Sequence, residues 1–259
     1  MGEHSRLIPK PLVPVGSQPI LWHIMKYYAH YGHTDFVICL GHQAEAIKKY
    51  FINYNEALTN DFVLSDGGNH IELVNRDFVD WRITFVDTGM RSNVGERLRR
   101  VRPYLEGEEY FLAHYADTLT DVPLPKLVDE LVDSGKVGNF LCVRPTNYSF
   151  HTVDIGSGSE VRAIRDVLES DLWINGGFFV FRRDIFDVMK PGEDLVQEPF
   201  QRLIERGDLL AHRYEGFWAP MDTLKDRQTL ELLAESGACP WAVWDSNDGA
   251  GAEAGTAER

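Results

Sequence analysis

The residue of this sequence with the clearest potential for chemistry is Asp117, which follows the apolar run Tyr110–Ala116. The run is short, rich in aromatic residues and bracketed by polar ones, which is typical of a strand buried in a sheet. Ligands of open α/β sheets bind just beyond the carboxyl ends of the strands. A carboxylate at that point can hold a metal that in turn holds phosphates. The alternative interpretation is that Asp117 only caps a turn or the next helix.

Lys10 and Asp222 could serve the same ligand. Lys10 lies in residues 8–16, where three prolines exclude a helix and a central strand and predict a stiff extended segment. A lysine held in this way is a good point charge for a phosphate, although a surface lysine in a linker is the simpler interpretation. Asp222 precedes a predicted helix over residues 224–235, where a structural N-cap is the alternative role.

Two further stretches have residue types that suit a sugar or a phosphate. In the predicted strand 173–181, a glycine pair follows Asn175, and paired glycines weaken a strand unless something must approach its backbone. A bound sugar contacting Asn175 is one explanation, and a β-bulge is the other. The basic stretch 95–101 could face a phosphate, or it could be a solvated helix face.

The elements that must position these residues alternate between strands and helices. We predict buried strands over residues 35–40, 82–87, 110–116 and 139–143, and helices over residues 19–31, 44–54 and 124–134. Ser17 is a fair N-cap for the first helix, Asp66–Asn69 predicts a hairpin, and residues 209–214 predict an edge strand. This alternation is typical of an α/β sheet with parallel strands. We expect one domain over residues 1–245 and a disordered tail over residues 246–259, because the tail is rich in Ser, Asn, Gly, Ala and Glu.

Composition narrows the possible partners. The formal net charge of −14 argues against nucleic acid or an anionic membrane surface as the main partner, since both attract basic proteins. No apolar stretch is long enough to span a bilayer, and the first residues have no apolar signal core. The three cysteines are widely spaced and odd in number, which predicts reduced thiols and a cytoplasmic location.

The ordered set of motifs resembles the sugar-phosphate nucleotidylyltransferases, in particular their glucose-1-phosphate cytidylyltransferase branch. The matching runs are Pro9–Pro11, Pro19–Met25, Val86–Gly89, Tyr115–Asp117, Ile174–Phe179 and Gly216–Thr223. The resemblance implies a Rossmann-like mixed, mainly parallel sheet flanked by helices. It also implies transfer of a nucleoside monophosphate from a triphosphate, CTP in this branch, to a sugar 1-phosphate such as glucose 1-phosphate, with release of pyrophosphate.

The resemblance assigns roles to individual residues. It implies that the lysine matching Lys10 contacts phosphate and that the acids matching Asp117 and Asp222 hold Mg²⁺. It implies that the positions matching Ser92, Arg97 and Ala116 line the nucleotide pocket. Asn175 and Gly176 fall in the motif that we interpret as the sugar side. Relatives are commonly homo-oligomeric, so we expect a homo-oligomer.

Two features depart from the family pattern. The family opens with a strand and a glycine-rich loop, L-x-G-G-x-G-T-R, and here Met1 falls just after the position of that arginine, so the predicted sheet lacks its first strand. We expect Met1 to be an internal methionine of a longer protein; the alternative is a non-catalytic homologue that binds a nucleotide or a sugar phosphate. Many relatives also bind the sugar phosphate through a lysine where Val167 stands, and Arg162, Arg165 or another nearby cation could replace it.

A metal-dependent glycosyltransferase is a third hypothesis, since such enzymes can also use a Rossmann-like sheet. It would need an Asp-x-Asp motif at a strand end. Asp117 and the next acid, Asp121, do not have that spacing.

Overall fold

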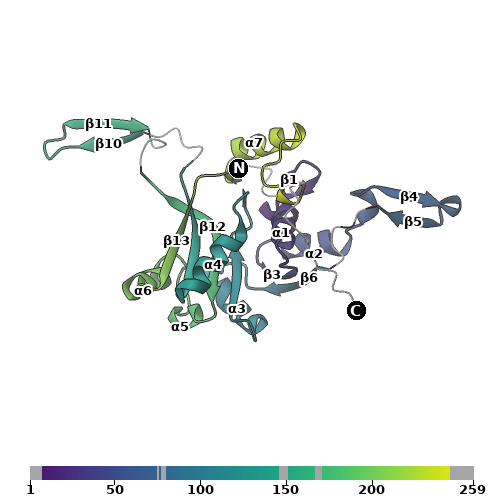
Figure 1. Cartoon of the computed structure of the whole chain (residues 1–259), viewed down its shortest axis with the longest axis horizontal. Coiled ribbons are helices and arrows are strands. Elements are labelled where there is room, and N and C mark those ends of the chain that lie inside the picture. The colour runs from purple at the N-terminus through teal and green to yellow at the C-terminus, as the bar shows by residue number, and fades with distance from the viewer. Residues whose placement is uncertain (1–7, 75, 77–79, 146–150, 167–170, 246–259) are drawn as a thin grey trace, which may run out of the picture.

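The computed structural model describes residues 8–74, 76, 80–145, 151–166 and 171–245. The predicted tail over residues 246–259 and the position of Val167 lie outside these residues. Strands run through the middle of the molecule and helices cover both sides (Figure 1). The helices are α1 Ile20–His30, α2 Ala44–Ile52, α3 Val94–Val101, α4 Leu124–Ser134, α5 Ile185–Val188, α6 Glu198–Arg206 and α7 Leu224–Glu235. None of these helices is both long and apolar enough to cross a membrane.

The largest sheet has four strands in the order β13-β9-β12-β7. Its strands are β7 Tyr110–His114, β9 Gly138–Val143, β12 Ile174–Arg182 and β13 Leu209–Tyr214. Strands β9 and β13 are parallel, whereas β12 runs antiparallel to both β9 and β7. The prediction of a mixed α/β sheet flanked by helices is therefore confirmed, and β13 lies at the edge as predicted.

Two smaller pairs of strands continue this architecture. Strands β3, Asp35–Leu40, and β6, Arg82–Asp87, form a parallel pair, and β8, Thr118–Thr120, pairs antiparallel with β14, Trp218–Pro220. In the described part of the chain, β3 bonds only to β6 and β7 only to β12, so each has one edge without a neighbouring strand. The outer backbone groups of β3 and β7 therefore have no strand partner among the described residues.

Strand β12 divides the core into two layers. Phe178 and Val180 point into one apolar cluster with α1 and α4, whereas Phe179 and Phe181 point into another with α3, α5 and α6. Because successive side chains of a strand point to opposite faces, a strand covered on both sides must be apolar throughout. This explains the continuous apolar run of β12, which fixes the position of the polar residues at its start.

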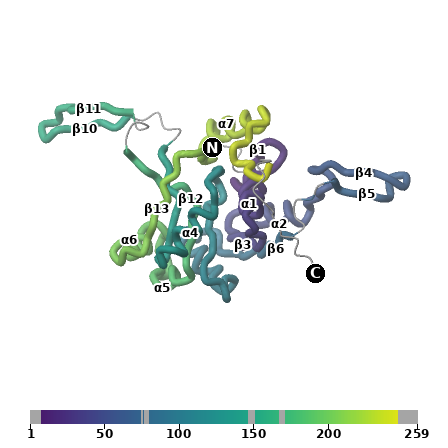
Figure 2. The backbone as a smooth tube through the Cα atoms, viewed as in Figure 1, coloured from purple at the N-terminus to yellow at the C-terminus, as the bar shows by residue number. Residues whose placement is uncertain are grey.

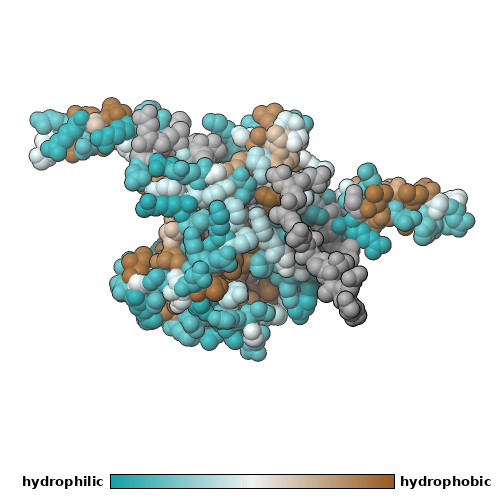
Figure 3. Space-filling view, in the orientation of Figure 1, coloured by the Kyte–Doolittle hydropathy of each residue, from teal (hydrophilic) through white to brown (hydrophobic). Residues whose placement is uncertain are grey.

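Two hairpins extend from opposite sides of the body (Figure 2). One is the antiparallel pair β4, Phe62–Ser65, and β5, His70–Leu73, which confirms the hairpin predicted around residues 66–69. The other is β10, His151–Ile155, with β11, Val161–Asp166. Apolar side chains cover parts of both arms in the space-filling view (Figure 3).

Two local predictions near the N-terminus were wrong. Lys10–Leu12 forms a short 3₁₀ helix rather than an extended segment, because Pro11 occupies its first turn, where no backbone donor is required. Pro14–Val15 and Gln18–Pro19 then form the short strands β1 and β2. Helix α1 therefore begins at Ile20 with Pro19 rather than Ser17 at its N-cap position.

Candidate active site

Lys10, Asp117 and Asp222 meet at one point in the structure. The Lys10 Nζ donates to Asp117 Oδ2 at 2.7 Å and to Asp222 Oδ1 at 2.6 Å. The lysine comes from the 3₁₀ helix, and the two acids follow strands β7 and β14. The three residues singled out from widely separated segments therefore form one cluster of charged side chains.

A short antiparallel ladder holds the two acids side by side. Pro220 lies opposite Thr118, and the Met221 backbone N–H donates to the Asp117 carbonyl at 2.9 Å. Asp222 does not cap α7, because Thr223 is the N-cap residue. The alternative role considered for Asp222 is thus filled by its neighbour, and its carboxylate remains available to Lys10.

The electrostatics of the cluster favour a cation between the two acids. Burial would lower the pKa of Lys10, but its hydrogen bonds and charge interactions with Asp117 and Asp222 outweigh burial and raise it. Burial raises the pKa of Asp117, and the charge of Asp222 adds to this rise while Lys10 opposes it. One ammonium facing two carboxylates leaves a net negative charge, which attracts a further cation.

The backbone just before Asp117 is unusual. Ala116 has a positive φ of 65°, a conformation that is uncommon for residues other than glycine. Its N–H donates to Nδ1 of the half-buried His114 at 2.7 Å, and the other ring nitrogen of His114 lies 3.0 Å from the Thr118 hydroxyl. Nδ1 must therefore be the acceptor, and a neutral imidazole supports the turn that aims Asp117.

A polar pair lies beside the acids at the start of β12. Asn175 Nδ2 donates to the Tyr115 hydroxyl at 3.1 Å, and Asn175 Oδ1 accepts from the Gly177 N–H at 2.9 Å. Burial raises the pKa of Tyr115 to about 12, Asn175 opposes this rise, and the charges of Asp194 and Asp117 add to it. Tyr115 therefore remains a neutral hydroxyl group near Asp117.

The glycine pair after Asn175 forms a bulge. The register of β12 against β9 shifts between Asn175 and Phe179. Gly176 is buried against the Leu141 side chain, and its carbonyl accepts a bond of 2.8 Å from the Trp218 indole. Gly176 thus packs within a β-bulge, the alternative to a sugar contact that the sequence left open. Asn175 is the polar residue of the motif.

Ser92 and Arg97 meet at the carboxyl ends of β3 and β6. Arg97 Nη1 donates to the Thr88 hydroxyl at 2.8 Å, and the Ser92 hydroxyl donates to the Thr88 carbonyl. The guanidinium of Arg97 lies against Gly41, where an added Cβ would be only 2.4 Å from Nη2. Ala116 packs against the apolar cluster beneath β3, which connects this region to Asp117.

An open pocket of about 500 Å³ adjoins these residues. Its lining combines glycines with polar, basic and acidic side chains: Gly89, Arg91, Ser92, Asn93, Glu96, Arg100, Pro191 and Gly192. Ser92 is part of the lining, whereas Arg97 contacts Thr88 and Gly41 behind it. Two arginines, one of them paired with Glu96, lie here at the carboxyl ends of two parallel strands, a place suited to phosphates.

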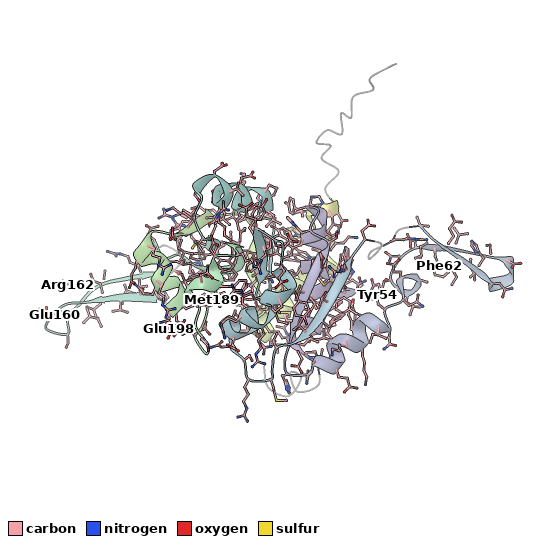
Figure 4. The ribbon with its side chains drawn as sticks, turned by 90° about the horizontal axis from the view of Figure 1, so that it is seen from below. Tyr54, Phe62, Glu160, Arg162, Met189 and Glu198 are labelled. Atoms are coloured by element: carbon pink, nitrogen blue, oxygen red, sulfur yellow. The ribbon has the colours of Figure 1, made fainter. Side chains whose placement is uncertain are left out.

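The predicted replacements for the sugar-phosphate lysine lie far from the acids. Arg162 and Arg165 belong to β11, and Figure 4 shows Arg162 near the outer end of its hairpin. Within one copy of the chain, neither residue joins the cluster around Lys10. Their role toward a sugar phosphate therefore stays a prediction, and other cations nearer the acids are also candidates.

Several polar residues at the site were not singled out from the sequence. They include Tyr115 and Thr88, which hold Asn175 and Arg97. Tyr115 directly precedes the Ala116–Asp117 pair, so its place at the end of a buried strand was a usable signal. The role of Thr88 depends on the pairing of β3 with β6, which short-range patterns do not reveal.

Comparison with known proteins finds relatives over nearly the whole chain. No family model matches the sequence. Curated glucose-1-phosphate cytidylyltransferases of Salmonella typhimurium and Salmonella typhi are each 37% identical to it over 247 residues, covering 95% of this chain and 95% of each relative. An apo UDP-glucose pyrophosphorylase structure has a TM-score of 0.66 at 12% identity, covering 92% of this chain and 94% of that chain. HddC from Yersinia pseudotuberculosis has a TM-score of 0.62 at 16% identity, covering 87% of this chain and 89% of its own.

Proposed function

Because this chain belongs to the family of the glucose-1-phosphate cytidylyltransferases, we propose that it transfers the cytidylyl group of CTP to glucose 1-phosphate. The products are CDP-glucose and pyrophosphate. The observation that carries the proposal is the convergence of Lys10, Asp117 and Asp222 on one point beside the carboxyl ends of the strands. Substrates would bind there and in the pocket that Ser92 lines.

The reaction needs positioning and charge neutralisation more than covalent chemistry. An oxygen of the sugar phosphate attacks the α-phosphorus, a new P–O bond forms, and the bond from that phosphorus to the pyrophosphate breaks. Negative charge spreads over the phosphoryl oxygens during this exchange. Lys10 supplies an ammonium for these oxygens, while Tyr115 and Asn175 donate hydrogen bonds that orient the sugar.

The two carboxylates fit a magnesium ion. Oxygens of Asp117 and Asp222 each lie within 2.7 Å of the same Lys10 nitrogen, so both already point at one cation. Among the described residues, no three His, Cys, Asp or Glu side chains form a metal cluster, so substrate phosphates and water would complete the coordination. Mg²⁺ is commonly bound by one or two carboxylates plus phosphates, and it would supply positive charge to the phosphoryl oxygens.

The proposal is tested by turnover. The protein is incubated with CTP, glucose 1-phosphate and Mg²⁺, and released pyrophosphate and CDP-glucose are measured. We expect stoichiometric formation of both, loss on addition of EDTA, and lower kcat/KM with the other nucleoside triphosphates. Thermal stabilisation by CTP and glucose 1-phosphate without turnover would support a binding protein instead and would overturn the proposal.

The hairpins support a homo-oligomer. Five apolar side chains of the first arm are at least 42% exposed and four of the second are at least 46% exposed: Phe62, Val63, Leu64, Ile71 and Val74, and Val153, Ile155, Val161 and Ile164. A two-stranded hairpin is marginally stable alone, and exposed apolar patches of this kind mark interfaces. We infer that each arm packs on another copy of the chain.

This inference predicts a change in mass when an arm is made polar. Sedimentation or light scattering is expected to give a multimer for the natural protein and smaller species for Leu64→Asp and Ile164→Asp. The matched control is Leu232→Asp, because Leu232 is 65% exposed on α7, away from both arms. A monomeric natural protein, or unchanged mass in both arm variants, would contradict the inference.

Since Cys39, Cys142 and Cys239 are free thiols, we place the enzyme in the reducing cytoplasm.

A further inference from the structure

Arg213 lies at the carboxyl end of the edge strand β13 with its charge unneutralised. Its guanidinium lies 5.3 Å from the centre of the Trp173 ring. Among the described residues, Arg213 makes no ion pair with a carboxylate, although the chain carries a net charge of −14. An exposed arginine without a carboxylate partner in so acidic a protein is a candidate anion-binding group.

The register places Arg213 in the same row as Asn175. Asn175 lies directly opposite Cys142 on β9, and Cys142 lies directly opposite Arg213 on β13. Directly paired residues of neighbouring strands point to the same face of a sheet. Burial raises the pKa of the Cys142 thiol and the Arg213 charge opposes that rise, which agrees with their being neighbours. Arg213 therefore shares a face with the residue nearest the sugar side of the site.

The distance suits a sugar phosphate. Neighbouring strands are about 4.8 Å apart, so the backbones of Asn175 and Arg213 are separated by roughly 10 Å. A hexose phosphate is of comparable length, so one that lies across this face of the sheet would reach both Asn175 and Arg213. On the other side of Asn175 lies Tyr115, which leads to Asp117. The row thus runs from the paired acids to the arginine.

Trp173 limits the freedom of Arg213. The Trp173 indole N–H donates to Asp171 at 3.3 Å, and the guanidinium of Arg144 also lies 5.1 Å from the ring centre. Arg144 is paired with Asp171 at 3.4 Å and with Glu215 at 3.3 Å, so its charge is already balanced. The arginine whose charge is left for a ligand is Arg213, held in place by stacking on the indole.

We propose that Arg213 binds the phosphate of the sugar 1-phosphate, in place of the lysine that many relatives carry at the position of Val167. A guanidinium can bind two phosphate oxygens at once, which fixes the orientation of the phosphate as well as its charge. This inference rests on the proposed cytidylyl transfer, because it assigns a residue to the sugar phosphate of that reaction.

The test separates the two substrates. Steady-state kinetics with CTP and glucose 1-phosphate are measured for the natural protein, Arg213→Met and Arg213→Lys. We expect Arg213→Met to raise the KM for glucose 1-phosphate roughly 10- to 100-fold, the value of one charged hydrogen-bonding group. The KM for CTP is expected to stay within about twofold, because the Ser92 pocket lies at the other end of the site. The KM for glucose 1-phosphate of Arg213→Lys is expected to lie between the values of the natural protein and Arg213→Met.

A control and a binding measurement keep the outcomes distinct. Arg206→Met removes another exposed arginine, at the end of α6, and is expected to leave both KM values unchanged. Calorimetric titration with glucose 1-phosphate measures the same contact without turnover. Turnover by the natural protein with an unchanged KM in Arg213→Met would overturn the role of Arg213 alone. Absence of turnover in the natural protein would overturn the proposed function, and weaker glucose 1-phosphate binding by Arg213→Met would still support the contact.

Discussion

Replacing Asp222 with asparagine is expected to separate catalysis from stability. Asp222→Asn keeps the size of the side chain and removes its charge. The Asp222 side chain is 58% exposed and bonds to Lys10, whereas the Asp117 side chain is only 24% exposed. Since α7 is capped by Thr223, the change leaves the fold of the helix start intact.

The expected magnitudes follow from these contacts. Removing one of the two carboxylates that would hold the charge-neutralising Mg²⁺ is expected to lower kcat/KM by roughly 10²- to 10³-fold, or about 3–4 kcal/mol of barrier. The exposed pair with Lys10 contributes only about 0–1 kcal/mol to folding. Its loss is offset in part because the substitution removes the repulsion that raises the pKa of Asp117. The Tm is therefore expected to change by less than about 4 °C.

Pyrophosphate release and thermal unfolding are measured on the same preparations. Asp129→Asn is the matched control, because Asp129 is an exposed acid on α4. This control is expected to keep both the activity and the Tm of the natural protein. Near-normal kcat/KM for Asp222→Asn at saturating Mg²⁺ would refute the assigned role. A large loss of stability would instead show that the Lys10 contact is structural.

Three further predictions concern the residues around the acids. Thr223→Ala removes the capping box with Asp226 and is expected to cost about 1 kcal/mol in urea unfolding. Gly41→Ala places a Cβ 2.4 Å from the Arg97 guanidinium, so Arg97 must move and the KM for CTP is expected to rise. The Tm is expected to change little, because the group that must move is the end of a flexible side chain. Burial lowers the pKa of His114 to about 3 in the folded protein. As the pH falls below 6.5, the His114 imidazole therefore takes up a proton in the unfolded chain but not in the folded protein, which favours unfolding. The free energy of unfolding is therefore expected to be about 2 kcal/mol lower at pH 5 than at pH 7. In the His114→Gln variant this difference between the two pH values is expected to be smaller.

Much of the fold could be predicted because its signals are local. The apolar run ending at Asp117, the helix following Pro19 and the hairpin around Asp66 each depend on periodicity or turn residues within a few positions. The structure has these elements as β7, α1 and the β4–β5 pair. The edge position of β13 was also predicted.

What could not be predicted depends on contacts between distant segments. The meeting of Lys10 with Asp117 and Asp222 was expected only through the family resemblance, since no spacing rule links positions so far apart. The role of Arg213 requires the registers of β9, β12 and β13 together. The turn at Lys10 was mispredicted because three prolines argue against regular structure, whereas one of them fits a single 3₁₀ turn.

The ladder of β8 and β14 has a consequence for how such an enzyme can diversify. Three residue pairs and the bond from Met221 to the Asp117 carbonyl set the spacing of the acids. The β10–β11 arm lies between the two acids in the sequence but forms a separate sheet that pairs with neither strand of this ladder. Insertions or exchanges there can alter which sugar is accepted or how copies assemble, while the catalytic pair is inherited unchanged.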